Sequence, residues 1–270
     1  MPTDAATLGL SLSPERMGDA SAGDVGFRFG DRGTHTSRTL MFEELTTLLD
    51  AAGPGTSRAA YRDLIIDDNC LGKRSAANRR ISNTRLGELY GLDEGVLLFR
   101  ILRHLWQSEQ RQRRLLALLV PLARDPLLRI TAEPVLKLDS GQELTRQSLT
   151  DVLTEATGSR FRQTVLDKVA RNAASSWTQS GHLEGRVRKR RRLVSPTPVV
   201  VTAALAIGYL LGARGERLFQ TLWARVLDTP GDELMNMAAD AKRLGMMEMN
   251  QAGGIVEVSF PRLLGRNGKG

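Results

Sequence analysis

The chain has 270 residues, a formal net charge of +8 and an isoelectric point near 10.2. Its length allows one or two domains with well-buried cores, and its charge favours an anionic partner such as nucleic acid or an acidic surface. The single cysteine, Cys70, excludes an internal disulfide and fits a reducing compartment, so we expect a cytoplasmic protein. The longest apolar run, 199–211, is shorter than the roughly 20 residues of a membrane span, so we expect no membrane span.

The composition favours helices over strands. Aromatic residues make up 5% of the chain, while leucine, alanine and arginine are abundant. We therefore predict a mainly α fold, a helical bundle with winged helix-turn-helix-like elements and a small C-terminal β-hairpin. Loop-forming residues divide the chain into a flexible tail (1–23), an N-terminal helical domain (24–140) and a C-terminal helical domain with a basic wing and the terminal hairpin (141–270).

Apolar residues recur at helical spacing through most of the N-terminal domain. They predict helices over 37–53, 57–67, 75–91, 93–107 and 108–123. For residues 126–138 we predict either a further helix or a linker, since Pro134 interrupts the helical pattern.

The helix that begins after Ser75 has cations on both sides of its start. Ser75 is a good N-cap. Four basic residues flank this cap, namely Lys73, Arg74, Arg79 and Arg80. Because the free amides of a helix start favour anions, the arrangement is typical of a phosphate site. Two interpretations stay open: a helix-turn-helix that contacts nucleic acid, or an ordinary amphipathic helix with a solvated arginine face.

The C-terminal domain shows the same helical periodicity. It predicts helices over 144–156, 160–176, 199–211, 216–227 and 232–245. Residues 246–261 alternate in polarity around Gly253-Gly254, which predicts a β-hairpin. Two parts of this domain share a pattern in which a glycine, Gly181 or Gly245, ends a helix before a strand or wing. We therefore predict one or two winged-helix-like units. The second copy of the pattern lacks cations, so we expect it to pack or pair with protein.

A run of basic residues follows the helix predicted over 160–176. Six of the seven positions from 186 to 192 carry a cation: Arg186, Arg188, Lys189, Arg190, Arg191 and Arg192. These charges repel one another unless a polyanion or a set of carboxylates relieves them. Their place after a helix is that of the basic wing beside a recognition helix. We therefore predict a contact with DNA or RNA, against the alternative of a solvated basic loop.

The sequence contains no recognisable catalytic or metal-binding pattern. The three histidines, His35, His104 and His182, are far apart, and Cys70 has no neighbouring histidine. The glycine-rich segments 212–217 and 265–270 lack the spacing of a phosphate-binding loop. We therefore predict no enzyme activity, no cofactor and no metal site.

One stretch resembles a known family. The pattern N-x-L-x-K-R-S at 69–75, followed by an arginine-rich helix and Arg-Leu at 85–86, is similar to the BrxA family of BREX bacteriophage-defence systems. The matching positions are Asn69, Leu71, Lys73, Arg74, Ser75, Arg79, Arg80, Arg85 and Leu86. The later order of a long helix, a Gly-x-Leu turn at 181–183, a basic segment and a Ser-Pro before an apolar helix also resembles it.

This resemblance covers about residues 40–215 and has three departures. The chain carries an extra N-terminal tail and a C-terminal extension of roughly 55 residues, and Asp125 stands where a fuller family signature is expected. The resemblance implies a small, mainly helical, cytoplasmic protein without catalytic residues. It also implies a DNA-binding accessory role in a multi-protein defence system.

Together these inferences predict a non-catalytic accessory protein of a BREX-type anti-phage system that binds duplex DNA chiefly through phosphates. Residues 186–192 would form the main contact, and residues 73–80 a second one. The expected partners are double-stranded DNA and other defence-system proteins, and the sequence does not predict an oligomeric state. The main alternative is a protein-interaction scaffold with a Met-rich docking surface at 235–249. A peripheral membrane protein and an RNA-binding protein are further alternatives.

Overall fold

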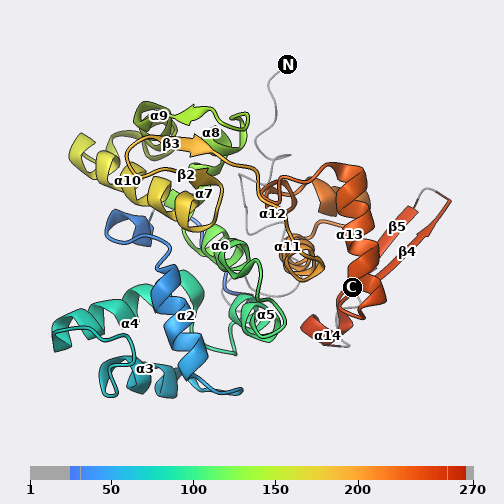
Figure 1. Cartoon of the computed structure of the whole chain (residues 1–270), viewed down its shortest axis with the longest axis horizontal. Coiled ribbons are helices and arrows are strands. Elements are labelled where there is room, and N and C mark those ends of the chain that lie inside the picture. The colour runs from blue at the N-terminus through green and yellow to red at the C-terminus, as the bar shows by residue number, and fades with distance from the viewer. Residues whose placement is uncertain (1–24, 31, 254, 266–270) are drawn as a thin grey trace.

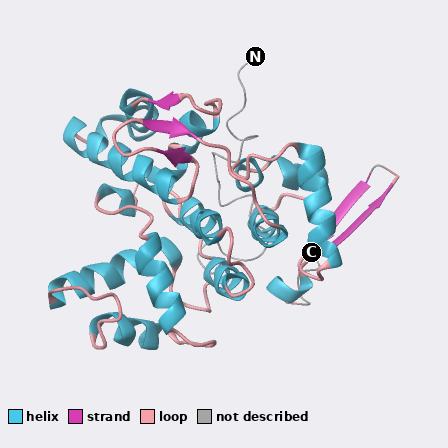
Figure 2. Cartoon of the chain, viewed as in Figure 1, coloured by secondary structure: helices cyan, strands magenta, loops and turns pink. Residues whose placement is uncertain are grey.

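The computed structural model of the chain describes residues 25–30, 32–253 and 255–265, so the predicted flexible tail lies outside the described residues. Helices dominate the fold (Figure 1). Two small antiparallel sheets lie far apart in the molecule (Figure 2). The mainly helical fold and the C-terminal hairpin are therefore confirmed. In the described part of the chain, no helix is both long and apolar enough to cross a bilayer.

The N-terminal helices follow the predicted order. They are α2 (Phe42–Ala51), α3 (Arg58–Ile66), α4 (Ala76–Tyr90), α5 (Leu97–Trp106) and α6 (Arg113–Arg124). Ser75 caps α4 as predicted, because its hydroxyl oxygen accepts a hydrogen bond from the amide of Asn78 at 3.2 Å. The first helix begins later than predicted, at Phe42 instead of Ser37. The preceding residues form the 3-10 turn η2 (Thr34–Thr36) and a segment that packs on the C-terminal half of the chain.

Helix α11 (Pro198–Leu210) is the centre of the molecule. Every side chain from 199 to 208 is buried, which is expected for a helix that is apolar on all sides. It packs against α5 and α6 on one side and against α12 (Leu222–Arg225) and α13 (Gly231–Arg243) on the other (Figure 1). This apolar segment is therefore the shared core of the two halves of the chain.

Residues 126–192 form one structural group, here called the first hairpin unit. It contains α7 (Pro126–Ile130), α8 (Ala132–Leu136), β1 (Glu143–Leu144), α9 (Arg146–Thr157), η3 (Gly158–Arg160), α10 (Gln163–Gln179), β2 (Leu183–Glu184) and β3 (Lys189–Arg191). The three strands pair antiparallel in the order β1-β3-β2. The helix predicted to start at Leu144 begins at Arg146, because Leu144 pairs with Lys189 and the Thr145 side chain caps α9.

Residues 198–259 form the second hairpin unit. After α11 it contains the 3-10 helix η4 (Gly215–Gln220), then α12, α13, β4 (Glu248–Ala252) and β5 (Ile255–Ser259), and the short α14 (Pro261–Leu264) follows. The single helix predicted over 216–227 is divided in two. Thr221 leaves the helical conformation and its side chain caps α12 by accepting from the amide of Ala224. The second glycine of the predicted hairpin turn, Gly254, lies outside the described residues.

The predicted domain boundary at residue 140 lies inside the first hairpin unit. Helices α7 and α8 precede it, and both pack on α9, which follows it. The division into two domains remains a prediction.

Candidate nucleic-acid interface

The residues of the predicted basic wing form the hairpin of β2 and β3, and the name wing is kept for this hairpin. The two strands are joined by residues 185–188, and β2 contacts α10, beside which the hairpin runs (Figure 1). Gly185 has a φ of +94°, and a Cβ there would lie 2.1 Å from the carbonyl oxygen of Arg188. This tight turn therefore requires glycine. It places the residues between 185 and 189 at the tip of the wing.

Arg191 has a structural role in this hairpin. It is 2% exposed, and its guanidinium forms an ion pair with Asp228 from the second hairpin unit. The same guanidinium donates to the carbonyl of Arg192 at 2.5 Å. A buried, paired cation cannot reach a phosphate, so we exclude Arg191 from the candidate interface although the sequence placed it there.

Arg190 and Lys189 are also engaged within the sheet. Arg190 is exposed but stands opposite Glu143 on one side and Glu184 on the other. Carboxylates directly across the strands attract a cation and offset its charge. Lys189 is half-buried, and its ammonium donates to the carbonyl of Gly185 at 2.9 Å. Burial lowers the pKa of this lysine.

The three remaining cations of the run are exposed. In the described part of the chain, the side chains of Arg186, Arg188 and Arg192 have no hydrogen-bond or ion-pair partner. Arg186 and Arg188 stand on either side of Val187, which is 90% exposed. Residues 186–188 are here called the wing tip. The fold thus divides one basic run into a buried, paired arginine, two cations within the sheet and three exposed cations at or beyond its ends.

The outer face of α10 adds polar residues to the interface that the sequence reasoning left out. Its exposed residues are Arg162 at the N-cap and Gln163, Thr164, Lys168 and Arg171 along the helix. The opposite face is buried and includes Leu166, Val169 and Trp177. The signal was present in the sequence, because the outward positions Thr164, Lys168 and Arg171 recur at spacings of four and three residues. The contact between α10 and β2, which the sequence pattern does not show, places the hairpin beside this helix.

The second predicted site, at the start of α4, is partly occupied by internal contacts. The ammonium of Lys73 binds the carboxylate of Glu44 at 2.9 Å, and Arg79 donates to the carbonyl of Ile66 at 2.7 Å. Both cations therefore hold neighbouring elements together. Arg74 and Arg80 are exposed. Of the four predicted cations, these two are placed where they could contact a ligand.

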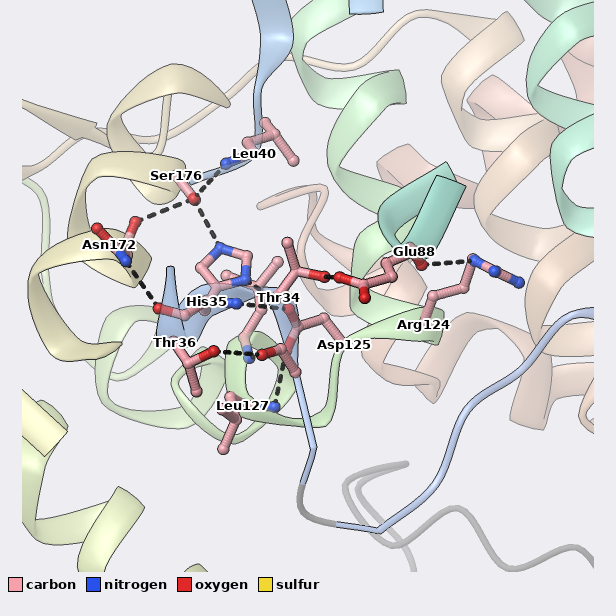
Figure 3. Close-up of polar contacts among 12 residues, drawn as sticks. Thr34, His35, Thr36, Leu40, Glu88, Arg124, Asp125, Leu127, Asn172 and Ser176 are labelled. Atoms are coloured by element: carbon pink, nitrogen blue, oxygen red, sulfur yellow. Dashed lines mark hydrogen bonds and ion pairs between the residues drawn. The ribbon is translucent and has the colours of Figure 1, made fainter. Parts of the chain in front are cut away.

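A buried polar network joins the N-terminal segment to α7 and α10 (Figure 3). The ring nitrogen Nδ1 of His35 donates to Asp125 at 2.7 Å, and Nε2 lies 2.8 Å from the hydroxyl of Ser176. Burial acts to raise the pKa of the Asp125 carboxyl, but the His35 charge and hydrogen bonds from His35 and Leu128 hold it below its usual range. Asp125 also caps α7 through the amides of Leu127 and Leu128.

This order of contacts is also that of a Ser-His-Asp catalytic triad, but its setting is structural. Ser176 and His35 are completely buried, so a substrate cannot reach the hydroxyl. The same hydroxyl oxygen accepts the amide of Leu40 at 2.7 Å. We therefore interpret the network as a set of structural hydrogen bonds that hold residues 33–40 on α10.

His182 joins the two hairpin units. Its Nε2 donates to the carbonyl of Val226 at 2.8 Å, and its Nδ1 lies 2.8 Å from the hydroxyl of Ser180. Burial lowers its pKa to about 4, although the nearby Asp228 charge opposes this shift. His182 is therefore neutral at pH 7. Together with the Arg191–Asp228 pair, it fixes the base of the wing on the second unit.

Comparisons with known proteins add no family assignment. The chain matches no protein-family model, and no curated protein is significantly similar to it in sequence. The resemblance to BrxA therefore remains a prediction. Within the residues that the structure describes, no group of three or more histidine, cysteine or acidic side chains could hold a metal ion.

Proposed function

We propose that this protein binds duplex DNA through its phosphates, with the outer face of α10 and the wing tip acting as one surface. Following the resemblance to BrxA, we further propose that it does so as a non-catalytic accessory of a BREX-type anti-phage system. The observation that carries the DNA proposal is the pair of exposed, unpaired cations at the wing tip, Arg186 and Arg188, next to a helix with a polar outer face.

The topology of the first hairpin unit supports this proposal. A helix and a short strand precede two helices, and a two-stranded hairpin follows, with the first strand paired to the last. A winged helix-turn-helix has the same order. In helix-turn-helix proteins the second helix of the motif lies in the major groove, so α10 would take that place. The wing tip would then contact the adjacent backbone.

The charge distribution supports it as well. Five exposed cations lie on this surface: Arg162, Lys168, Arg171, Arg186 and Arg188. If each neutralises one phosphate, the affinity for DNA falls with salt with a log–log slope of about −4.5. Gln163 and Thr164 lie at the start of α10, where a recognition helix reads bases, although the amide of Gln163 is held by Asp167 at 3.1 Å.

A fluorescence-anisotropy titration of a random duplex at several salt concentrations tests the proposal. We expect Arg186→Ala/Arg188→Ala to weaken binding and to reduce the slope by about 2, because two phosphate contacts are lost. The matched control is Lys137→Ala/Arg243→Ala, which removes two exposed cations that are already paired with Glu133 and Asp240. This control should keep the wild-type slope.

Two results would contradict the proposal: no binding of duplex at low salt, or equal slopes for the wing-tip variant and its control. The defence role needs a separate test, which is the plating efficiency of phage on cells with the wild-type protein and with the wing-tip variant. Equal plating efficiencies would show that DNA contact by the wing tip is not needed for the defence role.

The alternative of a protein-interaction scaffold is favoured by the second hairpin unit. Two large apolar side chains there are exposed, Leu244 at 60% and Ile255 at 66%. The adjoining hairpin carries Glu248 and Glu257 and no cation in its described strands. Exposed apolar side chains and carboxylates favour contact with protein over contact with DNA. Absence of DNA binding in the titration would favour this function.

A further inference from the structure

A second basic feature lies in the N-terminal half, in a pocket of about 890 Å³. It is formed by α3, the middle of α4, the end of α6 and the segment 26–28. Four arginines from these different elements line it: Arg28, Arg58, Arg62 and Arg124. This group cannot be recognised from the sequence, because its members are spread over almost one hundred residues.

The positive charge of the pocket is not balanced from within. Glu88 is the one acidic residue among the described residues that line it. The carboxylate of Glu88 accepts from Arg85 at 2.7 Å and from the hydroxyl of Thr34 at 2.9 Å. The negative charge of Glu88 is therefore compensated by Arg85, which does not line the pocket. Arg62 pairs with Asp63 where both side chains are more than half exposed, and such a pair is weak.

Arg124 fixes the inner wall of the pocket. It is 6% exposed, and its guanidinium donates to three backbone carbonyls, those of Gly26, Gly87 and Glu88. Figure 3 shows the contact with Glu88. Carbonyls hold the group in place without neutralising it. Burial and the charges of Arg28 and Arg58 lower its pKa to about 9, so it stays charged at pH 7.

The two outer arginines are anchored differently, Arg28 through its backbone and Arg58 through one guanidinium contact. The amide of Arg28 donates to the carbonyl of Ala123, and its own carbonyl accepts from Arg129. The guanidinium of Arg58 donates to the carbonyl of Gly91 at 3.1 Å. In the described part of the chain the guanidinium of Arg28 has no partner. Both groups are exposed and keep unused donors.

The floor of the pocket is open because α4 carries glycine there. A Cβ built on Gly87 would meet no atom within 4 Å. Gly87 has an ordinary helical backbone, so a side chain at this position would extend into the pocket without strain. The amide of Asn83, one turn earlier, lines the same space and adds a neutral donor.

We propose that this pocket binds a phosphate group through Arg28 and Arg58, with Arg124 as the fixed charge behind them. Guanidinium groups match the geometry of phosphate oxygens and bind them by paired hydrogen bonds. The phosphate belongs either to a free polyphosphate, such as a nucleoside triphosphate, or to a DNA backbone. The proposal does not depend on the function of the wing.

Isothermal titration calorimetry with inorganic triphosphate and with ATP tests the site on the full chain. We expect wild-type binding and a loss of about tenfold or more in affinity for Arg28→Gln/Arg58→Gln, since two charge-assisted contacts are removed. Gly87→Leu keeps every charge and fills the pocket, so it should show a similar loss. Leucine is a better helix former than glycine, so folding should not suffer.

Two controls separate the pocket from general basic charge. Lys137→Gln/Arg243→Gln removes the same number of cations elsewhere and should bind triphosphate like the wild type. Gly87→Ala tests whether the backbone at this position matters, and it should retain most of the binding.

The source of the phosphate is distinguished by the DNA titration. If a DNA backbone occupies the pocket, both pocket variants weaken DNA binding and the loss adds to that of the wing-tip variant. If a free polyphosphate occupies it, triphosphate binding is lost while DNA binding is unchanged. The proposal is overturned if neither ligand is affected by the pocket variants, or if Gly87→Leu binds like the wild type. The wing-tip variant should bind triphosphate normally, which separates this inference from the proposed function.

Discussion

The two hairpin units share a local plan but are stabilised differently. In each, a helix is followed by a glycine with positive φ, Gly181 at +95° and Gly245 at +70°, and then by an antiparallel hairpin. The first hairpin has strands of two and three residues and is completed by β1. The second has two five-residue strands that, within the described residues, pair only with each other. The same sequence pattern therefore produces the same chain path.

The buried polar residues are concentrated in the first unit. Within its 126–192 range they are Arg129, Thr131, Thr150, Ser176, Ser180, His182 and Arg191, whereas Thr202 alone is found among the described residues of the second. The second unit is held by apolar side chains such as Trp223, Met247 and Val258. Buried polar networks hold one geometry, but the removal of one partner causes a large loss of stability. The first unit, which carries the wing with the exposed cations, is therefore the one held by buried polar contacts.

The largest effect should come from breaking the polar attachment of the first wing. Arg191→Ala leaves Asp228 buried without its partner, so we expect a loss of about 3–5 kcal/mol in the free energy of unfolding. Urea denaturation at pH 7 measures it. The matched control is Arg190→Ala, one position away on the exposed face, which should change stability by less than about 0.5 kcal/mol. Similar effects of the two substitutions would contradict the separation of buried and exposed cations in β3.

The second-largest effect should be a pH dependence of stability that is specific to the first unit. His182 has a pKa of about 4 in the folded protein and an ordinary one when unfolded, so below pH 6.5 the unfolded chain binds a proton that the folded protein does not. Stability is therefore fully present above pH 6.5 and falls by about 3 kcal/mol as the pH drops towards 4. Asp125, which precedes the first unit and caps its helix α7, has a lowered folded pKa and adds a further loss of stability below the usual aspartate pKa.

Denaturation of wild type and His182→Gln between pH 7 and pH 4.5 measures this dependence. Glutamine does not titrate, so the variant should be less stable at pH 7 but should lose less stability on acidification. Hydrogen exchange should show that the amides of β2 and β3 lose protection at low pH before those of β4 and β5. Equal loss in both hairpins would contradict the proposed difference between the units.

A smaller effect is expected from the apolar attachment of the second wing. Met247 is 2% exposed at the start of the second hairpin, and Met247→Ala should cost about 2 kcal/mol. Since no charge is involved, this cost should be the same at pH 7 and pH 5. Urea denaturation at both pH values checks it, with the exposed Glu248→Ala as the control. A cost that changes with pH would show that polar contacts also hold the second unit.

The smallest effect should come from the wing tip itself. Val187 is 90% exposed, so Val187→Ser should change stability by less than about 0.5 kcal/mol. It removes no charge, so the salt slope of DNA binding should not change. Thermal denaturation and the DNA titration test both expectations. A flattened slope would mean that residue 187 positions the neighbouring cations.

Much of the fold could be predicted from local sequence signals. The serine cap of α4, the apolar stripe of α5 and the alternation of the C-terminal hairpin each specify an element through neighbouring residues. The prediction was wrong at 144–145 and at Thr221, where a long-range strand pairing and a local cap interrupt a helical pattern. Helical periodicity alone predicts neither the strand pairing nor the cap.

The candidate sites depended more on tertiary contacts. The six-cation run was visible, but the internal role of Arg191 depends on Asp228, which lies 37 residues further along the chain. The arginine pocket and the network of His35, Asp125 and Ser176 were not visible, because their members come from segments far apart in sequence. A spacing rule cannot find residues that only packing brings together.

The sequence alone determined the helical class, the positions of the turns and the basic character of the first wing, since propensity, capping and charge are local properties. The tertiary structure decided which of those cations are free. A strand places alternate side chains on opposite faces, but which face is buried depends on the element that packs against it. In this protein that element is the segment around Asp228, and it leaves the wing tip as the exposed basic surface.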